Sequence, residues 1–319
     1  MNLAANPASP NVTVIIPVRD CINFIQEALY SVLQQGYRDL ELLLVDDGST
    51  DADYRQFERL DPRLRVICLE GKGVSRARNT GMAQARGRLI AFLDADDVWF
   101  PGKLEAQVRY FELHPEVGVV FGAFTRWSPD SSGRFESASS LMSDCSAVSE
   151  CDAERSGWLY SRLLGGLLVG MNTAVIRREV YEALGGFNEA MRRGEDYDFW
   201  LKASRLFEMH ALDAKVALYR IHDASAMHRL SDENHLALLL HAASMRWGLS
   251  GPGGVALSEA EFNQRLSQVD FDHGYSHFWH GNRQVARHSF WQALRRGHMP
   301  WRSAAYVTLS FMPISCRPL

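Results

Sequence analysis

Three acidic clusters in the sequence have the residue types and spacing needed for catalysis. The densest is Asp94-Ala95-Asp96-Asp97, which directly follows an apolar run. In an extended chain, residues two apart project to the same side, so Asp94 and Asp96 point together and Ala95 points away. Neighbouring carboxylates repel each other unless a cation lies between them, and Mg²⁺ and Mn²⁺ prefer oxygen ligands. The cluster therefore predicts a divalent metal site.

The acidic clusters also have purely structural interpretations. An acid between a strand and a helix can cap the helix, and a helix is expected to begin at Pro101. Three acids in four residues exceed what a cap needs, so the metal site is favoured. Asp46-Asp47-Gly48-Ser49 is also typical of a turn. Glu195-Asp196 is equally suited to stabilise the first turn of a helix through its dipole.

A basic segment at residues 71–81 lies where a helix is expected to begin, and it contains Lys72, Arg76 and Arg78. The N-terminus of a helix attracts anions, and arginine adds charge-assisted hydrogen bonds to phosphate. Neither the G-x-G-x-x-G pattern nor the P-loop pattern is present. This absence argues against a Rossmann dehydrogenase and a P-loop enzyme.

The elements that position these residues alternate between strands and helices. Helical patterns separate the apolar runs, which predicts right-handed crossovers and a mostly parallel α/β sheet flanked by helices. In such sheets ligands bind beyond the carboxyl ends of the strands, where two of the acidic clusters lie. The strands expected in the first half of the chain are 12–18, 40–45, 64–69, 89–93 and 117–124.

The second half of the chain has a less regular pattern. Residues 128–152 are polar and rich in Ser, Asp and Gly, which is typical of a long mobile loop. From about residue 231 the pattern is helical only. These features predict a tail at 1–10, an α/β domain at 11–228 and a helical region at 229–319. Between them we expect helices at 153–164 and 195–206, a helix ending at 185–186, and strands at 171–176 and 216–221.

The composition narrows the classes of partner. The chain has 319 residues and a net charge of −4, so no general basic field favours nucleic acid. Neither a secretory signal nor a run of about 18 apolar residues is evident. Five scattered cysteines favour reduced thiols and a cytoplasmic location, although Cys145 and Cys151 leave a zinc half-site as an alternative.

Taken in order, several segments resemble the family 2 glycosyltransferases with the GT-A fold. They are VTVIIPV, LELLLVDDGSTD, GKGVSRARNTGM, GRLIAFLDADD and GGFNEAMRRGEDYDFWLK, and the resemblance covers roughly residues 11–225. It implies transfer of a sugar from a nucleotide-diphosphate sugar, with UDP the expected nucleotide, to a hydroxyl acceptor. The transfer would invert the anomeric configuration and serve the synthesis of a cell-surface polysaccharide or glycolipid.

The resemblance also implies roles for individual residues. Asp96 and Asp94, completed by His222, would hold Mn²⁺ or Mg²⁺, and Asp196, next to Glu195, would be the general base. The Tyr-Asn pair usual after Pro-Val is replaced here by Arg19-Asp20. The residues expected to bind the nucleotide sugar are Pro17, Val18, Arg19, Asp46, Asp47, Arg78, Asp94 and Ala95.

Two rival functions are a nucleotidyltransferase and a non-catalytic nucleotide-sugar-binding module. The first would carry a glycine- and lysine-rich loop after the first strand, where this chain has Pro17-Val18-Arg19-Asp20. The second would lack Asp96 or Asp196, and both are present.

The acceptor would be a saccharide or a lipid-linked sugar, and the helical region leaves three interpretations open. It packs on the α/β domain, pairs with another copy of the chain, or lies in part on the inner face of a membrane as a peripheral contact. The residues that suggest the membrane contact are Trp301, Arg302, Tyr306, Val307, Leu309, Phe311, Met312 and Arg317.

Overall fold

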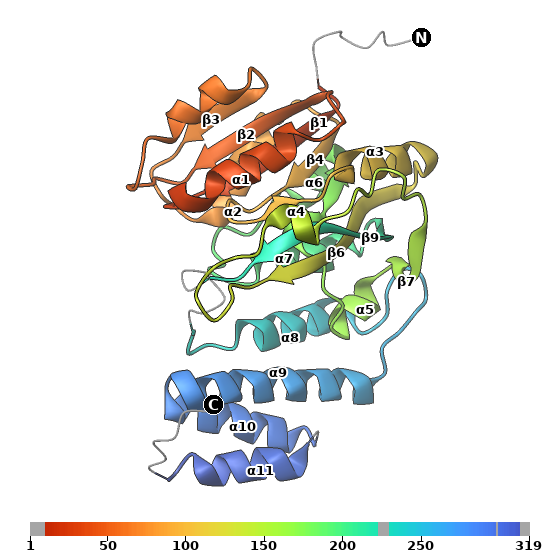
Figure 1. Cartoon of the computed structure of the whole chain (residues 1–319). Coiled ribbons are helices and arrows are strands. Elements are labelled where there is room, and N and C mark those ends of the chain that lie inside the picture. Colours follow the sequence, from red (N-terminus) through yellow and green to blue (C-terminus); the bar gives the residue numbers. More distant parts are fainter. Residues whose placement is uncertain (1–9, 223–229, 298, 313–319) are drawn as a thin grey trace. The chain divides into compact units, whose positions relative to one another are not determined.

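The computed structural model describes residues 10–222, 230–297 and 299–312, and the chain divides into two compact units (Figure 1). The first unit contains residues up to 159 together with 168–222, and the second contains 160–167 and the residues from 223 onward. Residues 160–167 contain the short helix α5 (Tyr160–Leu164). The sequence did not predict that they belong with the helical unit.

A nine-stranded sheet forms the first unit, in the order β3-β2-β1-β4-β8-β6-β9-β5, with β7 paired to β9. Strands β1 to β4 run parallel to one another, whereas β8 runs antiparallel to both β4 and β6. The sheet is therefore mixed, and its parallel part is the half that the sequence predicted most clearly. Its strands are β1 (Val12–Val18), β2 (Leu40–Asp46), β3 (Leu64–Cys68), β4 (Leu89–Phe92), β5 (Val98–Trp99), β6 (Val117–Trp127), β7 (Cys151–Gly157), β8 (Val175–Arg177) and β9 (Glu208–Arg220).

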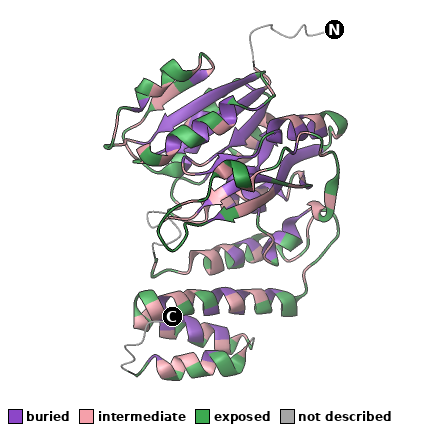
Figure 2. Cartoon of the chain, in the orientation of Figure 1, coloured by how far each residue is buried: buried purple, intermediate pink, exposed green. Residues whose placement is uncertain are grey.

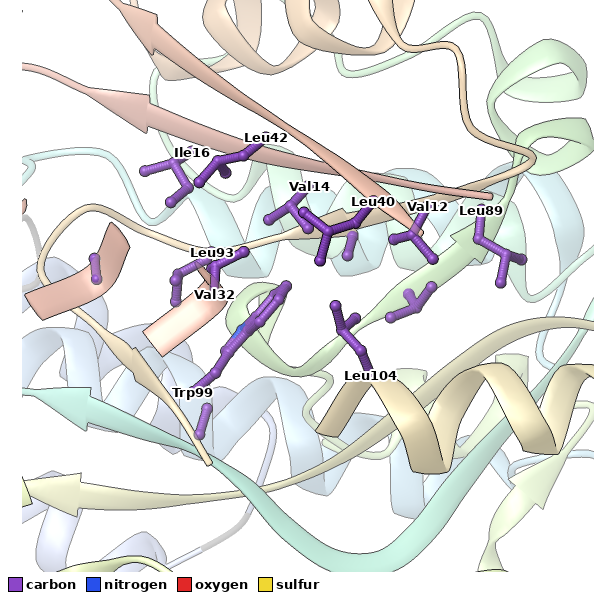
Figure 3. Close-up of a cluster of buried hydrophobic side chains, with 14 of the residues drawn as sticks. Val12, Val14, Ile16, Val32, Leu40, Leu42, Leu89, Leu93, Trp99 and Leu104 are labelled. Carbon is purple, nitrogen blue, oxygen red and sulfur yellow. The ribbon is translucent and has the colours of Figure 1, made fainter. Parts of the chain in front are cut away.

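Helices cover both faces of the parallel half. Alternate residues of β1, including Val14 and Ile16, pack in one core with α1 (Ile22–Leu33) and α3 (Lys103–Leu113), as Figure 3 shows. The opposite face of β1 meets α2 (Val74–Gln84), where a Cβ added to Gly81 would lie 2.6 Å from Ile15 Cγ2. The absence of a side chain at Gly81 therefore lets α2, which carries Arg78, lie directly on the sheet.

The register of the parallel strands brings their carboxyl ends to one edge. Val18 of β1 pairs with Asp46 of β2, and Ile15 of β1 pairs with Phe92 of β4. The acids that follow β2 and β4 therefore leave the sheet on the same side, on either flank of β1. The remaining helical segments of this unit are η1 (Tyr54–Leu60), α4 (Ala138–Leu141), η2 (Met171–Thr173), α6 (Arg178–Leu184) and α7 (Glu195–Ala203).

Three predicted elements differ from the structure. Residues 153–164 form the end of β7 followed by α5 and not one helix, because the polar residues of β7 pair with β9 at the border of the sheet. The strand predicted at 171–176 is the turn η2 followed by the short antiparallel β8. The strand predicted at 216–221 is the end of the 13-residue β9.

The polar segment 128–152 packs against the sheet instead of forming a loose loop. Cys145 and Trp127 are buried with Phe100 and Val216, and apolar side chains of the segment pack around them. Arg109 of α3 donates from Nη2 to the carbonyl oxygens of Ser146 and Val148 at 2.6 and 2.9 Å. A few apolar residues hold this segment against the sheet. They are scattered among polar residues, so the sequence pattern did not reveal them.

From residue 235 onward, the named elements of the second unit are all helices. A small aromatic core, which includes Phe271, Phe278 and Phe290, lies between its last three helices, and Figure 2 shows their buried and exposed faces. No helix in the described part of the chain has both the length and the apolarity needed to cross a bilayer. The helices are α8 (His235–Trp247), α9 (Glu259–His280), α10 (Arg283–Arg295) and α11 (Pro300–Leu309).

Lys103 is a buried amine in the core of the first unit. Its side chain is fully buried at the start of α3, where Nζ donates to Gln107 Oε1 at 2.6 Å and lies 4.0 Å from the centre of the Trp99 ring. Burial lowers the pKa of Lys103 from 10.5 to about 7. An amine with a lowered pKa binds a proton less readily in the folded chain than in the unfolded chain.

Replacement of this lysine is expected to change the pH dependence of stability. Between pH 7 and 10.5 the unfolded state keeps the proton that the folded state has lost, so the free energy of unfolding rises with pH, by up to about 1.4 kcal/mol per unit. Lys103→Met should lack this rise, as measured by urea unfolding at pH 7, 8 and 9. The matched control is Lys215→Met, because Lys215 is exposed on β9. A constant difference between wild type and Lys103→Met across this range would contradict the prediction.

Candidate active site

Arg78 connects the acids that follow β4 with the acids that begin α7. From α2 its Nη2 donates to Asp94 Oδ1 at 2.8 Å, and its Nη1 donates to Glu195 Oε1 at 3.1 Å. The side chain is almost fully buried. Burial alone would lower the pKa of Arg78, but the charges of Asp94 and Glu195 more than offset this effect and raise it. One permanently charged side chain thus joins Asp94 to Glu195, which lies 117 positions after Arg78 in the sequence.

Asp96 pairs with an imidazole that arrives from the end of β9. His222 Nε2 lies 2.9 Å from Asp96 Oδ2, and the His222 ring packs on Phe24 with the two ring centres 4.7 Å apart. Burial, followed by the charge of Asp94, raises the pKa of Asp96, and the hydrogen bond with His222 partly offsets that rise. Asp96 is therefore a carboxylate whose negative charge a cation would stabilise.

Asp97 is a structural bridge. Its Oδ2 accepts from Asn172 Nδ2 at 2.6 Å and its Oδ1 accepts from the backbone N–H of Arg220 at 2.9 Å. Only 1% of its surface is exposed, and burial, followed by the charges of Asp94 and Asp96, raises its pKa well above the usual range. Asp97 therefore ties the end of β4 to η2 and β9, and it caps no helix.

Arg220 supports the acidic segment through hydrogen bonds to its backbone and to Asp97, a role that no sequence pattern indicates. Its Nε donates to the Asp96 carbonyl oxygen at 2.7 Å, and its Nη2 donates to Glu27 of α1. The guanidinium lies 3.9 Å from the centre of the Trp127 ring. An isolated arginine at the end of a strand has no distinguishing pattern, and only the structure shows that Arg220 pairs with Trp127 across β9 and β6.

The acids at the end of β2 organise the neighbouring backbone. Asp47 Oδ1 and Oδ2 accept from the N–H groups of Lys72 and Gly73, both at 2.8 Å, and Asp46 Oδ1 accepts from Ser49 at 2.8 Å. Asp47 is 3% exposed. These contacts favour the turn interpretation for both acids and fix the loop that leads into α2. A direct contact with a nucleoside, which the resemblance implies, stays a prediction.

The other residues predicted to bind the nucleotide have different environments. Pro17 and Val18 are buried within β1, and the Val18 carbonyl oxygen accepts from the Asp47 N–H at 2.8 Å. Ala95 is also buried and belongs to the main core. The Arg19 side chain is 56% exposed and lies 3.9 Å from Asp47 Oδ2. Arg19 is thus the member of this group whose side chain is free to meet a ligand at the surface.

Asp196 lies beside Glu195 at the start of α7 but has a different set of contacts. Its Oδ1 accepts from the Tyr197 N–H at 2.7 Å, and among the described residues no hydrogen bond reaches Oδ2. Burial, followed by the charge of Glu195, raises the pKa of Asp196, while the charge of Arg78 opposes the rise. Arg78 donates to Glu195 and not to Asp196, so Asp196 is the acid of this pair that the arginine does not hold.

The predicted metal ligands are only partly assembled. Across the described ranges, no group of three or more carboxylate, imidazole or thiol side chains is arranged to hold a cation. Asp94 faces Arg78, whereas Asp96 and His222 face each other. A carboxylate and an imidazole fit Mn²⁺ or Mg²⁺ if phosphate oxygens and water supply the other ligands, as is common for these ions. The side chains present therefore fit a cation that is shared with a diphosphate.

Comparison with known proteins identifies the family. The model for "Glycosyl transferase family 2" matches residues 13–143. The putative teichuronic acid biosynthesis glycosyltransferase TuaG of Bacillus subtilis is 30% identical over 217 residues, which are 66% of this chain and 79% of TuaG. The UDP-Glc:alpha-D-GlcNAc-diphosphoundecaprenol beta-1,3-glucosyltransferase WfgD of Escherichia coli is 31% identical over 193 residues, 60% of this chain and 68% of WfgD. Three uncharacterised glycosyltransferases of Rickettsia species also match, but this chain spans only 29% to 36% of their length.

Solved structures share the fold. TarS 1–349 of S. aureus in complex with UDP superimposes with a TM-score of 0.61 at 20% identity, covering 93% of this chain and 83% of that chain. The mannosyltransferase PcManGT of Pyrobaculum calidifontis, in complex with GDP-Man and Mn²⁺, gives 0.57 at 21% identity and covers 96% and 82%. At these identities the structures support the GT-A fold alone. With the match to TuaG, they lead to one conclusion: this chain belongs to glycosyl transferase family 2.

Proposed function

We propose that the chain transfers a sugar from a nucleotide-diphosphate sugar to a hydroxyl group of an acceptor, with inversion at the anomeric carbon. The observation that carries this proposal is the ion-pair bridge from Asp94 through Arg78 to Glu195, because it brings a donor-side acid and an acceptor-side acid to one edge of the sheet. Family membership supports the reaction class.

On the donor side, Asp96 and His222 are the residues that would hold a divalent cation. When bound, Mn²⁺ or Mg²⁺ supplies positive charge next to the diphosphate, whose negative charge grows as it departs. Arg78 contributes by holding the Asp94 carboxylate in a fixed orientation. UDP is the nucleotide we expect, since WfgD is named for UDP-Glc and TarS was solved with UDP.

On the acceptor side, Asp196 removes the proton from the attacking hydroxyl. The hydroxyl oxygen forms a bond to the anomeric carbon, and the bond from that carbon to the diphosphate oxygen breaks, so the nucleoside diphosphate leaves with the electron pair. A partly buried carboxylate with a raised pKa is a stronger base than a solvated one, which suits this role. One displacement with one base gives inversion.

The acceptor class is proposed from the named relatives. TuaG is named for teichuronic acid biosynthesis and WfgD for a sugar on diphosphoundecaprenol. We therefore propose a saccharide or lipid-linked sugar as the acceptor, in the synthesis of a cell-surface polysaccharide or glycolipid.

Removal of the proposed base should abolish transfer without loss of donor binding. Asp196→Asn is expected to lower kcat by about 10²–10⁴-fold, because proton removal by a positioned base contributes this much. The affinity for UDP, measured by calorimetry, should change little. Asp198→Asn is the matched control, since Asp198 belongs to the same first turn but pairs with Lys202. Retention of the anomeric configuration in the product, determined by NMR, would exclude the single-base role.

The rate should fall as the pH is lowered through the raised pKa of Asp196. Only the ionised carboxylate accepts a proton, and burial raises the pKa of Asp196 above its usual value of 3.8. The acidic limb of kcat/KM against pH is therefore expected above the usual aspartate range. Arg78→Gln should move that limb to still higher pH, because the charge of Arg78 favours the ionised form of Asp196. An unchanged limb in Arg78→Gln would contradict this role of the arginine.

Loss of the carboxylate at Asp96 should remove both activity and metal binding. Asp96→Ala is expected to abolish sugar transfer, and calorimetry should detect no stabilisation of UDP binding by Mn²⁺. His222→Ala should weaken the same coupling less, because the carboxylate remains. Asp130→Ala, at an exposed turn of the same unit, serves as the control and should behave as wild type. Normal Mn²⁺-dependent UDP binding by Asp96→Ala would overturn the proposed metal site.

A further inference from the structure

The last part of the sequence has a charge balance opposite to that of the whole chain. Residues 281–319 contain six of the 34 lysine and arginine residues and none of the 38 aspartate and glutamate residues, although the net charge of the protein is −4. Among these arginines, Arg296 pairs with Asp270 of α9 at 3.0 Å. The segment that forms α10 and α11 is therefore a local basic region on an acidic protein.

Helix α11 exposes large apolar side chains within this basic region. Trp301 is 88% exposed and Phe311, just after the helix, is 66% exposed. Tyr306, Val307 and Leu309 of the same segment pack on the aromatic core of the unit instead. Helix α11 is thus already anchored through one side, and the exposure of Trp301 and Phe311 lies on the part that the core does not use.

Arginine side chains border these exposed aromatic residues. The Arg287 guanidinium of α10 lies 3.7 Å from the centre of the Phe311 ring, and its Nη2 donates to the Ser310 carbonyl oxygen at 3.2 Å. Arg302 follows Trp301 in the sequence and is exposed, and its guanidinium lies 5.2 Å from the centre of the Phe271 ring. Aromatic rings and carbonyl oxygens orient these cations without cancelling their charge. We call the surface formed by Arg287, Trp301, Arg302, Phe311 and Met312 the α11 face.

We propose that the α11 face binds the surface of a membrane that contains anionic lipids. Tryptophan is enriched at the level of the lipid head groups, and arginine attracts anionic head groups from the same depth. A short amphipathic helix with both residue types lies in the plane of the interface and does not cross the bilayer. The bound state would be reversible, because only a few side chains enter the lipid.

The structure corrects the set of residues that the sequence suggested for such a contact. Tyr306, Val307 and Leu309 are part of the core, and Arg317 lies outside the described residues. Trp301, Arg302, Phe311 and Met312 are exposed, and Arg287 from the preceding helix joins them. The helical pattern alone could not separate the side that packs from the side that remains open.

The test is the binding of the full chain to vesicles in the absence of any nucleotide sugar. Vesicles of phosphatidylcholine with about one-third phosphatidylglycerol should bind the protein, pure phosphatidylcholine should bind it at least tenfold more weakly, and 0.5 M NaCl should release it. One basic residue near an anionic surface contributes a factor of about five, so reversal of one charge should weaken binding about 25-fold. Arg302→Glu is the variant for this comparison.

Matched variants test whether vesicle binding depends on the α11 face or on any exposed charged or apolar side chain. Arg59→Glu, an exposed arginine of η1, should bind vesicles as wild type does, in contrast to Arg302→Glu. Trp301→Ala should weaken binding at least tenfold, whereas Met245→Ala, which removes a 76% exposed side chain of α8, should not. Equal binding to both vesicle types, or equal effects of the α11 variants and their controls, would overturn the proposal.

Two further outcomes would also overturn it. Absence of vesicle binding by the wild-type chain is one. A Trp301-dependent dimer, detected by light scattering without lipid, is the other, because it would assign the α11 face to a second copy of the chain. UDP binding by the same variants, measured separately, should remain unchanged, so failure of the membrane contact and failure of the proposed transferase function are distinguishable.

Discussion

The site depends on the two ion pairs of Arg78. A buried guanidinium is favourable only when carboxylates surround it, and Asp94 and Glu195 supply them from two different elements. The dependence is mutual, because Asp94, Asp96 and Asp196 would repel one another without a fixed positive charge nearby. The position of α2 on the sheet, permitted by Gly81 against Ile15, therefore decides whether the two halves of the site meet.

A second buried arginine, Arg220, meets a similar constraint at the end of β9. Arg220 holds the backbone of Asp96 and is stacked near Trp127, and its own backbone satisfies Asp97. Asp97 can thus be buried in the acidic turn, because both of its oxygens accept hydrogen bonds from the protein. The four residues 94–97 divide their tasks accordingly: Asp94 is held by Arg78, Asp96 faces His222, and Asp97 anchors the turn.

The parallel half of the fold and the location of the site were predictable from the sequence, because buried strands with acids at their carboxyl ends leave a strong local pattern. The antiparallel half was harder. β7 is polar and exposed along much of its length, so its pairing with β9 depends on partners distant in sequence. Arg220 and Asn172 were missed for the same reason, since each gains its role only when β9 and η2 reach the end of β4. The backbone contacts of Asp47 depend likewise on a loop 25 residues away.

The contrast between Glu195 and Asp196 shows how this electrostatic arrangement can favour one acid as a base. Both lie in the first turn of α7, where the helix dipole stabilises their ionised forms. Arg78 contacts Glu195 directly, which makes Glu195 less available as a base. The arginine also lies near enough to Asp196 to oppose the rise in the pKa of Asp196. Burial acts in the other direction and keeps Asp196 more basic than a solvated aspartate. A general base of this kind must be ionised and yet more basic than a solvated aspartate. The charge of Arg78 favours the ionised form of Asp196, and burial keeps this carboxylate basic.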